Sequence, residues 1–309
     1  MTNDTIKTKD AIDNHWVHTM APRWMRPYLR LARADRPIGT WLLLWPCWWS
    51  IGLATDEGTW PSLWMLILFA IGAFFMRGAG CTVNDMADRD FDAKVDRTKL
   101  RPIPAGEISL KQAFLFLAFQ AFVGLMVLLQ FNDFAIALGV SSLVLVVIYP
   151  FMKRITYWPQ FVLGLTFNWG ALLGWAAVRG DLSLSPILLY IGGVFWTLGY
   201  DTIYAHQDKE DDMMIGVKST ALKFGDQTRP VLLLFYLLTT TFFAASGYYA
   251  DMGMVFYGGV TLFAGQLLWQ WYRLDIDSPE TCLNLFRSNT VAGWLLFLGI
   301  IVDQSGVFL

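Results

Sequence analysis

Long apolar stretches alternate with short polar connections along this chain from residue 38 onwards. Each stretch has about 20 residues, the length that a helix needs to cross the hydrocarbon core of a bilayer. In lipid each segment must satisfy its own backbone hydrogen bonds, so the pattern predicts an all-α polytopic membrane bundle. Nine transmembrane helices are expected, at 38–54, 62–82, 111–130, 133–151, 159–178, 186–205, 229–249, 252–271 and 289–307.

Local signals mark several helix starts. Ser109 followed by Gln112 forms a capping box for the third span. Pro159 suits a first helical turn, and so does Pro186, with Ser185 before it as the N-cap.

Composition supports a membrane protein and places its polar loops. The chain has 309 residues, 55% of them hydrophobic, and a mean hydropathy of +0.44, which argues against a soluble enzyme. All Lys and Arg residues except Arg179 fall in the N-terminal tail or on one side of the predicted bundle. Because Lys and Arg mark the cytoplasmic side, the N-terminus and the active site should face the cytoplasm. We expect neither a nucleic-acid ligand nor an obligate protein partner.

Residues 1–36 read as a cytoplasmic tail ahead of a single domain, 37–309. Arginines interleaved with aromatic residues in its second half predict an amphipathic helix on anionic headgroups, or else a lid over the active site. No secretory signal is present, and Asp4, Asp10 and Asp13 are unlike a transit peptide. We therefore expect a bacterial inner membrane rather than a mitochondrial one.

The connection after the second span carries an acidic motif. Asn84, Asp85, Asp88 and Asp92 form N-D-x-x-D-x-x-x-D, and on one continuous helix positions 84, 88 and 92 share a face. Carboxylates at this spacing repel one another unless a cation neutralises them. Their hard oxygen atoms suit Mg²⁺, which commonly completes its shell with substrate phosphates.

Basic residues, Arg97 and Arg101 among them, follow the acidic motif directly. Acidic and then basic groups at a membrane surface predict a diphosphate bridged by a metal. The alternative is a charged loop that only solvates two helix ends.

A second acidic cluster follows the sixth span. Asp201, Asp208 and Asp212 share a helical face, with Lys209 and Lys218 nearby. The corresponding positions indicate a weak duplication of four-helix units, with each cluster holding one Mg²⁺ on one diphosphate. Lys153 and Arg154, after the fourth span, are either further diphosphate contacts or an orientation signal.

Arg77 and Asp201 lie deeper in their spans than the other charged residues. Ionisable groups at membrane depth are costly and therefore mark functional sites. The two side chains form an ion pair, take part in catalysis, or do both. His206, beside the second cluster, reads more simply as a neutral polar contact.

Five motifs resemble the UbiA-type membrane prenyltransferases. The acidic motifs are typical of the whole family, and the last two are similar to the branch that prenylates 4-hydroxybenzoate in ubiquinone biosynthesis. The motifs are R-x-D-R-P-I-G-T-W-L-L-L-W-P (33–46), M-R-G-A-G-C-T-V-N-D-x-x-D-x-x-x-D (76–92), R-T-x-x-R-P-x-P-x-G (97–106), Y-P-F-M-K-R-x-T-x-x-P-Q (149–160) and Y-D-T-x-Y-A-x-x-D-K-E-D-D-x-x-x-G-x-K-S-T-A (200–221).

The resemblance implies nine helices around a central cavity, dependence on Mg²⁺, and transfer of a polyprenyl group from polyprenyl diphosphate to 4-hydroxybenzoate. By carry-over, metal and diphosphate would be held by Asn84, Asp85, Asp88, Asp92, Asp208 and Asp212. Further diphosphate contacts would be Arg97, Arg101, Lys153, Arg154, Lys209 and Lys218.

The acceptor ring is attacked at the carbon ortho to its hydroxyl, and diphosphate is released. Arg77 or Arg36 would clamp the acceptor carboxylate, because Arg suits planar two-point recognition. Asp201 would assist deprotonation of the ring or orient Arg77. The alternatives are a sister enzyme that acts on a naphthoate, a homogentisate or a haem, and an ion-coupled transporter.

Overall fold

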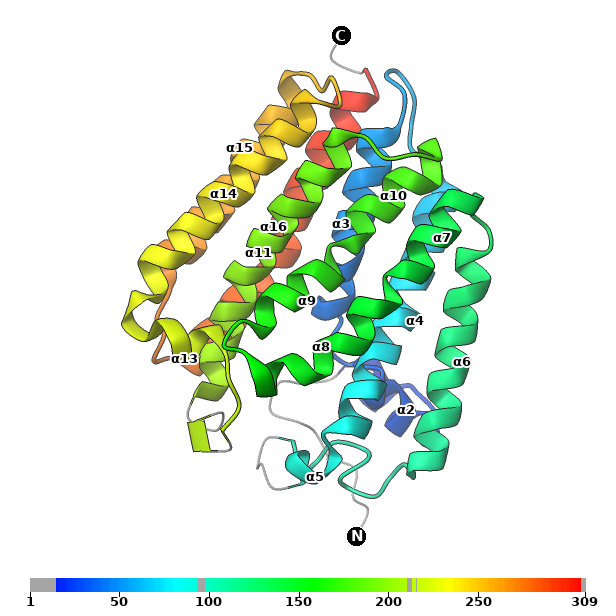
Figure 1. Cartoon of the computed structure of the whole chain (residues 1–309), viewed down its shortest axis with the longest axis vertical. Helices are drawn as coiled ribbons and strands as arrows, with labels where there is room; N and C mark the ends of the chain where they lie inside the picture. Colours follow the sequence, from blue (N-terminus) through cyan, green and yellow to red (C-terminus); the bar gives the residue numbers. More distant parts are fainter. Residues whose placement is uncertain (1–14, 94–97, 210–212, 215, 307–309) are drawn as a thin grey trace. The chain divides into compact units, whose positions relative to one another are not determined.

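The computed structural model describes residues 15–93, 98–209, 213–214 and 216–306. Their regular structure is entirely helical, which confirms the all-α part of the predicted fold class (Figure 1). The chain divides into two compact units. Unit 1 comprises residues 1–40 and 71–127, and unit 2 comprises residues 41–70 and 128–309. This division differs from the predicted boundary at residue 36, so the domain organisation stays a prediction.

Unit 1 is built on two long helices, α4 (Leu63–Ala87) and α6 (Leu110–Leu128), which approach each other closely. A Cβ atom added to Gly78 would lie 2.4 Å from Gln120 Nε2, and one added to Gly124 would lie 2.4 Å from Met76 Sδ. Small residues at such an interface let helices pack in a membrane. The elements are α1 (Trp16–Thr19), α2 (Arg26–Leu31), the start of α3 (Ile38–Ala54), most of α4 (Leu63–Ala87), α5 (Arg89–Asp92) and nearly all of α6 (Leu110–Leu128).

The short helix α2 packs on the loop before α6. Leu31 is fully buried against Ile103, Ile108 and Ala113, and the Arg30 guanidinium forms an ion pair with Glu107. The amphipathic surface helix expected in the second half of the tail stays a prediction. Its early part is exposed, as Trp24 shows, but its later part is held against the protein because Leu31 has an apolar partner there.

Unit 2 contains the remaining helices. In it α11 lies beside α14, and α15 lies beside α16 (Figure 1). A Cβ on Gly259 would be 2.8 Å from the Cα of Gly299, so α15 and α16 touch through their backbones. The elements are α7 (Asp133–Ser141), α8 (Leu143–Ile155), α9 (Pro159–Phe167), α10 (Trp169–Arg179), α11 (Leu184–Ala205), η1 (His206–Asp208), α13 (Thr220–Phe224), η2 (Gly225–Gln227), α14 (Thr228–Tyr248), α15 (Met254–Arg273) and α16 (Pro279–Gln304).

Among the described residues, six helical segments are long and apolar enough to cross a membrane, so a polytopic membrane protein is supported. They are 63–87, 110–128, 133–155, 159–179, 220–248 and 279–304, and α3 is apolar but shorter. Nine membrane crossings therefore stay a prediction.

Helix ends test the sequence signals. The capping box is confirmed, because Ser109 N donates to Gln112 Oε1 at 2.9 Å and Gln112 N donates to Ser109 Oγ at 3.3 Å. The N-cap at Ser185 is wrong, since α11 begins at Leu184 and Ser185 Oγ donates to the Ser246 carbonyl at 2.9 Å instead. The last helix begins at Pro279 rather than near residue 289, because Ser278 caps it.

Candidate active site

The first acidic motif spans a break between two helices. We expected one continuous helix, but α4 ends at Ala87 and Asp88 adopts a non-helical conformation as the N-cap of α5. The i to i−4 backbone bonds nevertheless continue, with Asp88 N donating to the Asn84 carbonyl at 2.9 Å and Asp92 N to the Asp88 carbonyl at 2.8 Å. Positions 84, 88 and 92 therefore still lie approximately on one face, although the helix is interrupted at Asp88.

Two arginines neutralise this motif. Arg33 Nη2 lies 2.6 Å from Asp85 Oδ1. Arg101 Nη1 lies 3.2 Å from the same Asp85 oxygen and 2.7 Å from Asp92 Oδ2. Asp85, Asp88 and Asp92 are all buried, so the arginines offset a repulsion that water would not screen.

Arg33 occupies an unusual backbone conformation. Its φ of 59° lies in the left-handed region, which costs free energy for a residue other than glycine. The conformation lets Arg33 Nη1 donate to the Arg30 carbonyl at 3.1 Å while Nη2 reaches Asp85. From the sequence, Arg33 is predicted to lie in the surface helix and opens the first of the five motifs, but no contact with the acidic motif is expected of it. The available signal was its place in the run R-x-D-R-P, just before the first span.

Burial and charge act in opposite directions on these groups. Burial lowers the pKa of Arg33, but Asp85 and other nearby anions outweigh it, so this pKa is raised above its usual range. Burial raises the pKa of Asp92; Arg101 opposes this change, while Asp85 and Asp88 add to it. Positive charge beside the motif therefore stabilises its ionised form.

The donor set fits Mg²⁺ in chemistry but does not form a ready coordination sphere. Asp85 Oδ2 is buried and has no hydrogen-bond partner among the described residues, which suits a cation ligand because a buried unpaired oxygen is costly. Within those same ranges, however, no three His, Cys, Asp or Glu side chains gather as metal ligands. Asp85 and Asp92 are instead paired with Arg33 and Arg101, and these ion pairs set the orientation of the two carboxylates.

The other site residues predicted in unit 1 have varied surroundings. Arg77 Nη1 lies 2.6 Å from Cys81 Sγ, one turn before Asp85. Arg36 pairs with its neighbour Asp35 at 3.3 Å. Asn84 is half-buried near the end of α4, and Arg97 lies outside the described residues.

The second acidic segment begins where α11 ends. Asp201 is half-buried in the last turns of α11, and Asp208 closes the short helix η1. Asp212 lies outside the described residues. His206 is buried, and its pKa is lowered to about 4 by burial and by Lys209, with Asp277 opposing the change. The reading of His206 as a neutral polar group is supported.

The basic residues around this segment have different surroundings. Lys218 Nζ donates to the Ile155 carbonyl at 3.1 Å and lies 5.5 Å from the centre of the Tyr157 ring. Lys218 N also donates to the Lys153 carbonyl at 3.0 Å, which joins two predicted diphosphate contacts through their backbones. Lys209 and Lys153 are half-buried and Arg154 is exposed.

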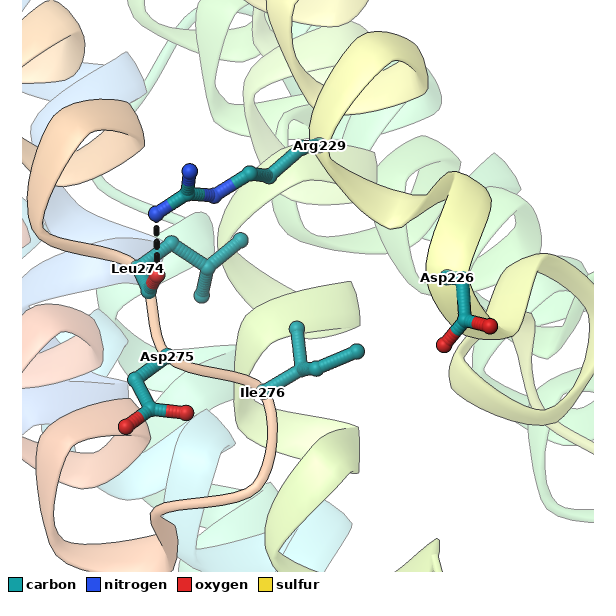
Figure 2. A pocket seen from close by; sticks show the side chains of 5 residues that line it. All are labelled: Asp226, Arg229, Leu274, Asp275 and Ile276. Carbon is teal, nitrogen blue, oxygen red and sulfur yellow. Dashed lines mark hydrogen bonds between the residues drawn. The ribbon is translucent and has the colours of Figure 1, made fainter.

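A cavity of about 450 Å³ lies elsewhere in unit 2 (Figure 2). Asp226, Arg229, Leu274, Asp275 and Ile276 line it, and Arg229 Nη2 donates to the Leu274 carbonyl at 2.7 Å. None of the predicted site residues lines this cavity, so chemistry rather than cavity size identifies the candidate site.

Comparison with known proteins decides the family. Residues 43–299 match the UbiA prenyltransferase family. The chain belongs to this family. Among curated UbiA relatives, a mitochondrial 4-hydroxybenzoate polyprenyltransferase of Arabidopsis thaliana is 51% identical over 98% of this chain and 74% of its own length. The Homo sapiens protein of the same name is 54% identical over 92% of this chain and 77% of its own length.

Solved UbiA homologues share the fold. An apo homologue from Aeropyrum pernix K1 has a TM-score of 0.72 at 24% identity, with 85% of this chain and 97% of that chain covered. A homologue from Archaeoglobus fulgidus, bound to GPP and Mg²⁺, has a TM-score of 0.67 at 20% identity, with 90% of this chain and 99% of that chain covered.

The expected bacterial inner membrane is wrong. The two curated relatives, from Arabidopsis thaliana and Homo sapiens, are mitochondrial proteins of eukaryotes by name. The expectation rested on three aspartates among the first 14 residues, and the acidity of a short segment is weak evidence against the similarity of a whole membrane domain.

Proposed function

We propose that this chain transfers a polyprenyl group from polyprenyl diphosphate to the carbon ortho to the hydroxyl of 4-hydroxybenzoate, with release of diphosphate. Relatives named for this activity are more than half identical over most of the chain. The observation that carries the proposal is the buried acidic motif, whose Asp85 oxygen Oδ2 lacks a described partner beside two arginines.

The donor diphosphate is bound by the acidic segments together with basic residues. Asp85, Asp88 and Asp92, with Asn84, hold Mg²⁺, and Asp208 and Asp212 supply further carboxylates. When bound, Mg²⁺ draws negative charge from the departing diphosphate. The Archaeoglobus fulgidus homologue bound to GPP and Mg²⁺ supports this ligand class.

The arginines serve the same chemistry. Arg101 and Arg33 orient Asp85 through its Oδ1 atom, which leaves Oδ2 for the cation. Guanidinium groups beside the motif also stabilise the diphosphate as charge develops on it. Further contacts come from Arg97, Lys153, Arg154, Lys209 and Lys218, although Lys218 Nζ is already engaged by the Ile155 carbonyl.

The acceptor is bound by groups of complementary charge. Arg77 or Arg36 holds its carboxylate, and Asp201 orients Arg77 or accepts the ring proton. The Lys and Arg distribution supports nine crossings with these groups at the cytoplasmic face.

Product formation by purified protein in detergent tests the proposal. With geranyl diphosphate, 4-hydroxybenzoate and Mg²⁺, we expect a product with the mass of the prenylated acceptor, and we expect none with EDTA. Product from a naphthoate or homogentisate instead would move the protein to a sister activity. No product from any aromatic acceptor would contradict the proposed function.

A matched pair of variants tests the metal site. Asp88→Ala should abolish turnover at any practical Mg²⁺ concentration. Asp90→Ala should leave turnover unchanged, because the Asp90 side chain is 81% exposed and pairs only with its neighbour Arg89 among the described contacts. Equal activity of the two variants would contradict the assignment.

A further inference from the structure

The second acidic segment is the connection between α11 and α13, and a pair of buried hydrogen-bonded side chains holds each of its two ends. It leaves α11 and returns at α13. The first pair joins Thr202 Oγ1 and Thr220 Oγ1 at 2.6 Å, and Thr220 N donates to Gln160 Oε1 at 3.2 Å. These contacts fix the returning end of the segment to α11 and α9.

The second pair fixes the departing end of the segment, just before Asp208 in the chain. His206 Nε2 lies 2.9 Å from Thr228 Oγ1, and Thr228 Oγ1 donates to the Gly225 carbonyl at 2.7 Å. His206 and Thr228 are only 4% and 1% exposed, so water does not compete for these bonds.

The geometry assigns the tautomer of His206. A hydroxyl has one proton, and the Gly225 carbonyl can only accept, so the Thr228 proton is directed to Gly225. Nε2 must then carry a hydrogen and donate it to Thr228 Oγ1. The other ring nitrogen, Nδ1, is an acceptor, and it has no partner among the residues that the structure describes.

We propose that His206 is a positioning residue for the second acidic segment. Through Nε2 it ties the first turn after α11 to the start of α14, so that Asp208, two positions later, is held ready for Mg²⁺ and diphosphate. This inference rests on the proposed function. His206 itself touches neither substrate nor metal, and its effect passes through Thr228 and the backbone of η1.

Substituting His206 by Gln or by Asn distinguishes the role of Nε2 from that of Nδ1. The amide nitrogen of Gln reaches about as far as Nε2, whereas that of Asn reaches only about as far as Nδ1. His206→Gln should keep the half-saturating Mg²⁺ concentration and the KM for geranyl diphosphate within about twofold of the unmodified protein. His206→Asn should raise both about tenfold, the effect of one lost buried hydrogen bond, while the KM for 4-hydroxybenzoate stays unchanged.

Thr228 provides the matched partner test. Thr228→Val should reproduce the His206→Asn effect, and Thr228→Ser should not. The double variant carrying His206→Asn and Thr228→Val should be no worse than either single variant, because both remove the same bond. Melting temperatures without Mg²⁺ show which variants fold.

Equal behaviour of His206→Gln and His206→Asn would overturn the proposal. So would a lower melting temperature in His206→Asn with unchanged Mg²⁺ and donor dependence, since that result marks a purely structural contact. Asp208→Ala in the same assay separates this failure from a failure of the proposed function. If Asp208→Ala is inactive while His206→Asn is normal, only the positioning role is wrong. If Asp208→Ala is fully active, the positioning role and the assignment of Asp208 to the metal site are both wrong. No product from the unmodified protein would instead contradict the proposed function.

Discussion

Asp85 forms ion pairs with two arginines of unit 1. Its Oδ1 atom receives Arg33 and Arg101, and its Oδ2 atom has no partner among the described groups. Residue types alone predict that a buried carboxylate needs a cation. They do not predict which cation, because Arg33 lies 52 positions away and reaches Asp85 only through an uncommon backbone conformation.

Substitutions at Arg33 separate its charge from its backbone. Arg33→Gly and Arg33→Ala both remove the guanidinium from Asp85, so each should lower turnover at least tenfold, in line with the loss of one buried ion pair. Glycine tolerates a φ of 59° and alanine does not. Arg33→Gly should therefore be more stable than Arg33→Ala by about 1 kcal/mol, measured as melting temperature in detergent.

The control for Arg33 is Arg23→Ala, because Arg23 is exposed in the same segment. Its turnover and its melting temperature should match those of the unmodified protein. Full activity of Arg33→Ala would show that Arg101 alone suffices for Asp85.

His206 gives the protein a defined sensitivity to acid. Burial lowers the pKa of His206 from 6.5 to about 4, so between these values the unfolded chain binds a proton that the folded chain does not. Stability should fall as pH decreases through this window. His206→Gln has no such proton, so its melting temperature should depend less on pH between 6.5 and 4; identical slopes would contradict this cause.

The apolar stretches that become helices could be predicted from the sequence, but the breaks within two of them could not. The stretches 133–151 and 159–178 read as uninterrupted, yet the structure breaks them at Ser142 and Asn168. Hydropathy does not reveal such breaks, and the one at Asn168 has its partner in another helix. Asn168 Nδ2 donates to Thr197 Oγ1 in α11 at 2.8 Å, a contact that no local pattern announces.

The contact of Asn168 with α11 depends on a glycine. A Cβ at Gly193 would lie 2.1 Å from Asn168 Oδ1, whereas a Cβ at Gly258 in α15 would meet nothing within 4 Å. Gly193→Ala should lower stability by about 1–3 kcal/mol through overpacking. Gly258→Ala should be neutral or stabilising. Thermal unfolding in detergent compares the two, and equal shifts would contradict the close approach.

At the scale of the whole molecule, neither unit is a continuous piece of chain. Unit 2 takes residues 41–70 and then 128–309, so α4 begins in one unit and ends in the other. The acidic motifs, their spacing and the membrane class were readable from sequence. The two-unit division was not, because the apolar pattern of α4 is uniform across residue 70.

Substrate binding should be visible in the stability of the whole protein. A ligand that binds only the folded state raises the melting temperature. Mg²⁺ with geranyl diphosphate should therefore raise the melting temperature of the unmodified protein, and EDTA should reverse the shift. Asp88→Ala should show no shift, while Asp90→Ala should behave as the unmodified protein does.

The position of Arg33 makes the site depend on an intact link between the N-terminal segment and α3, in which Ala34 and Asp35 are buried. Arg33 precedes the first predicted span, so a cut between it and α3 severs the covalent link between its guanidinium and every membrane helix. All the helices would remain intact and embedded after such a cut, yet Asp85 would hold its arginine only by non-covalent contacts. A sample cut at this link would thus lose activity while keeping a nearly full-length band on a gel, and intactness of the N-terminal segment becomes a criterion of quality for any purified sample.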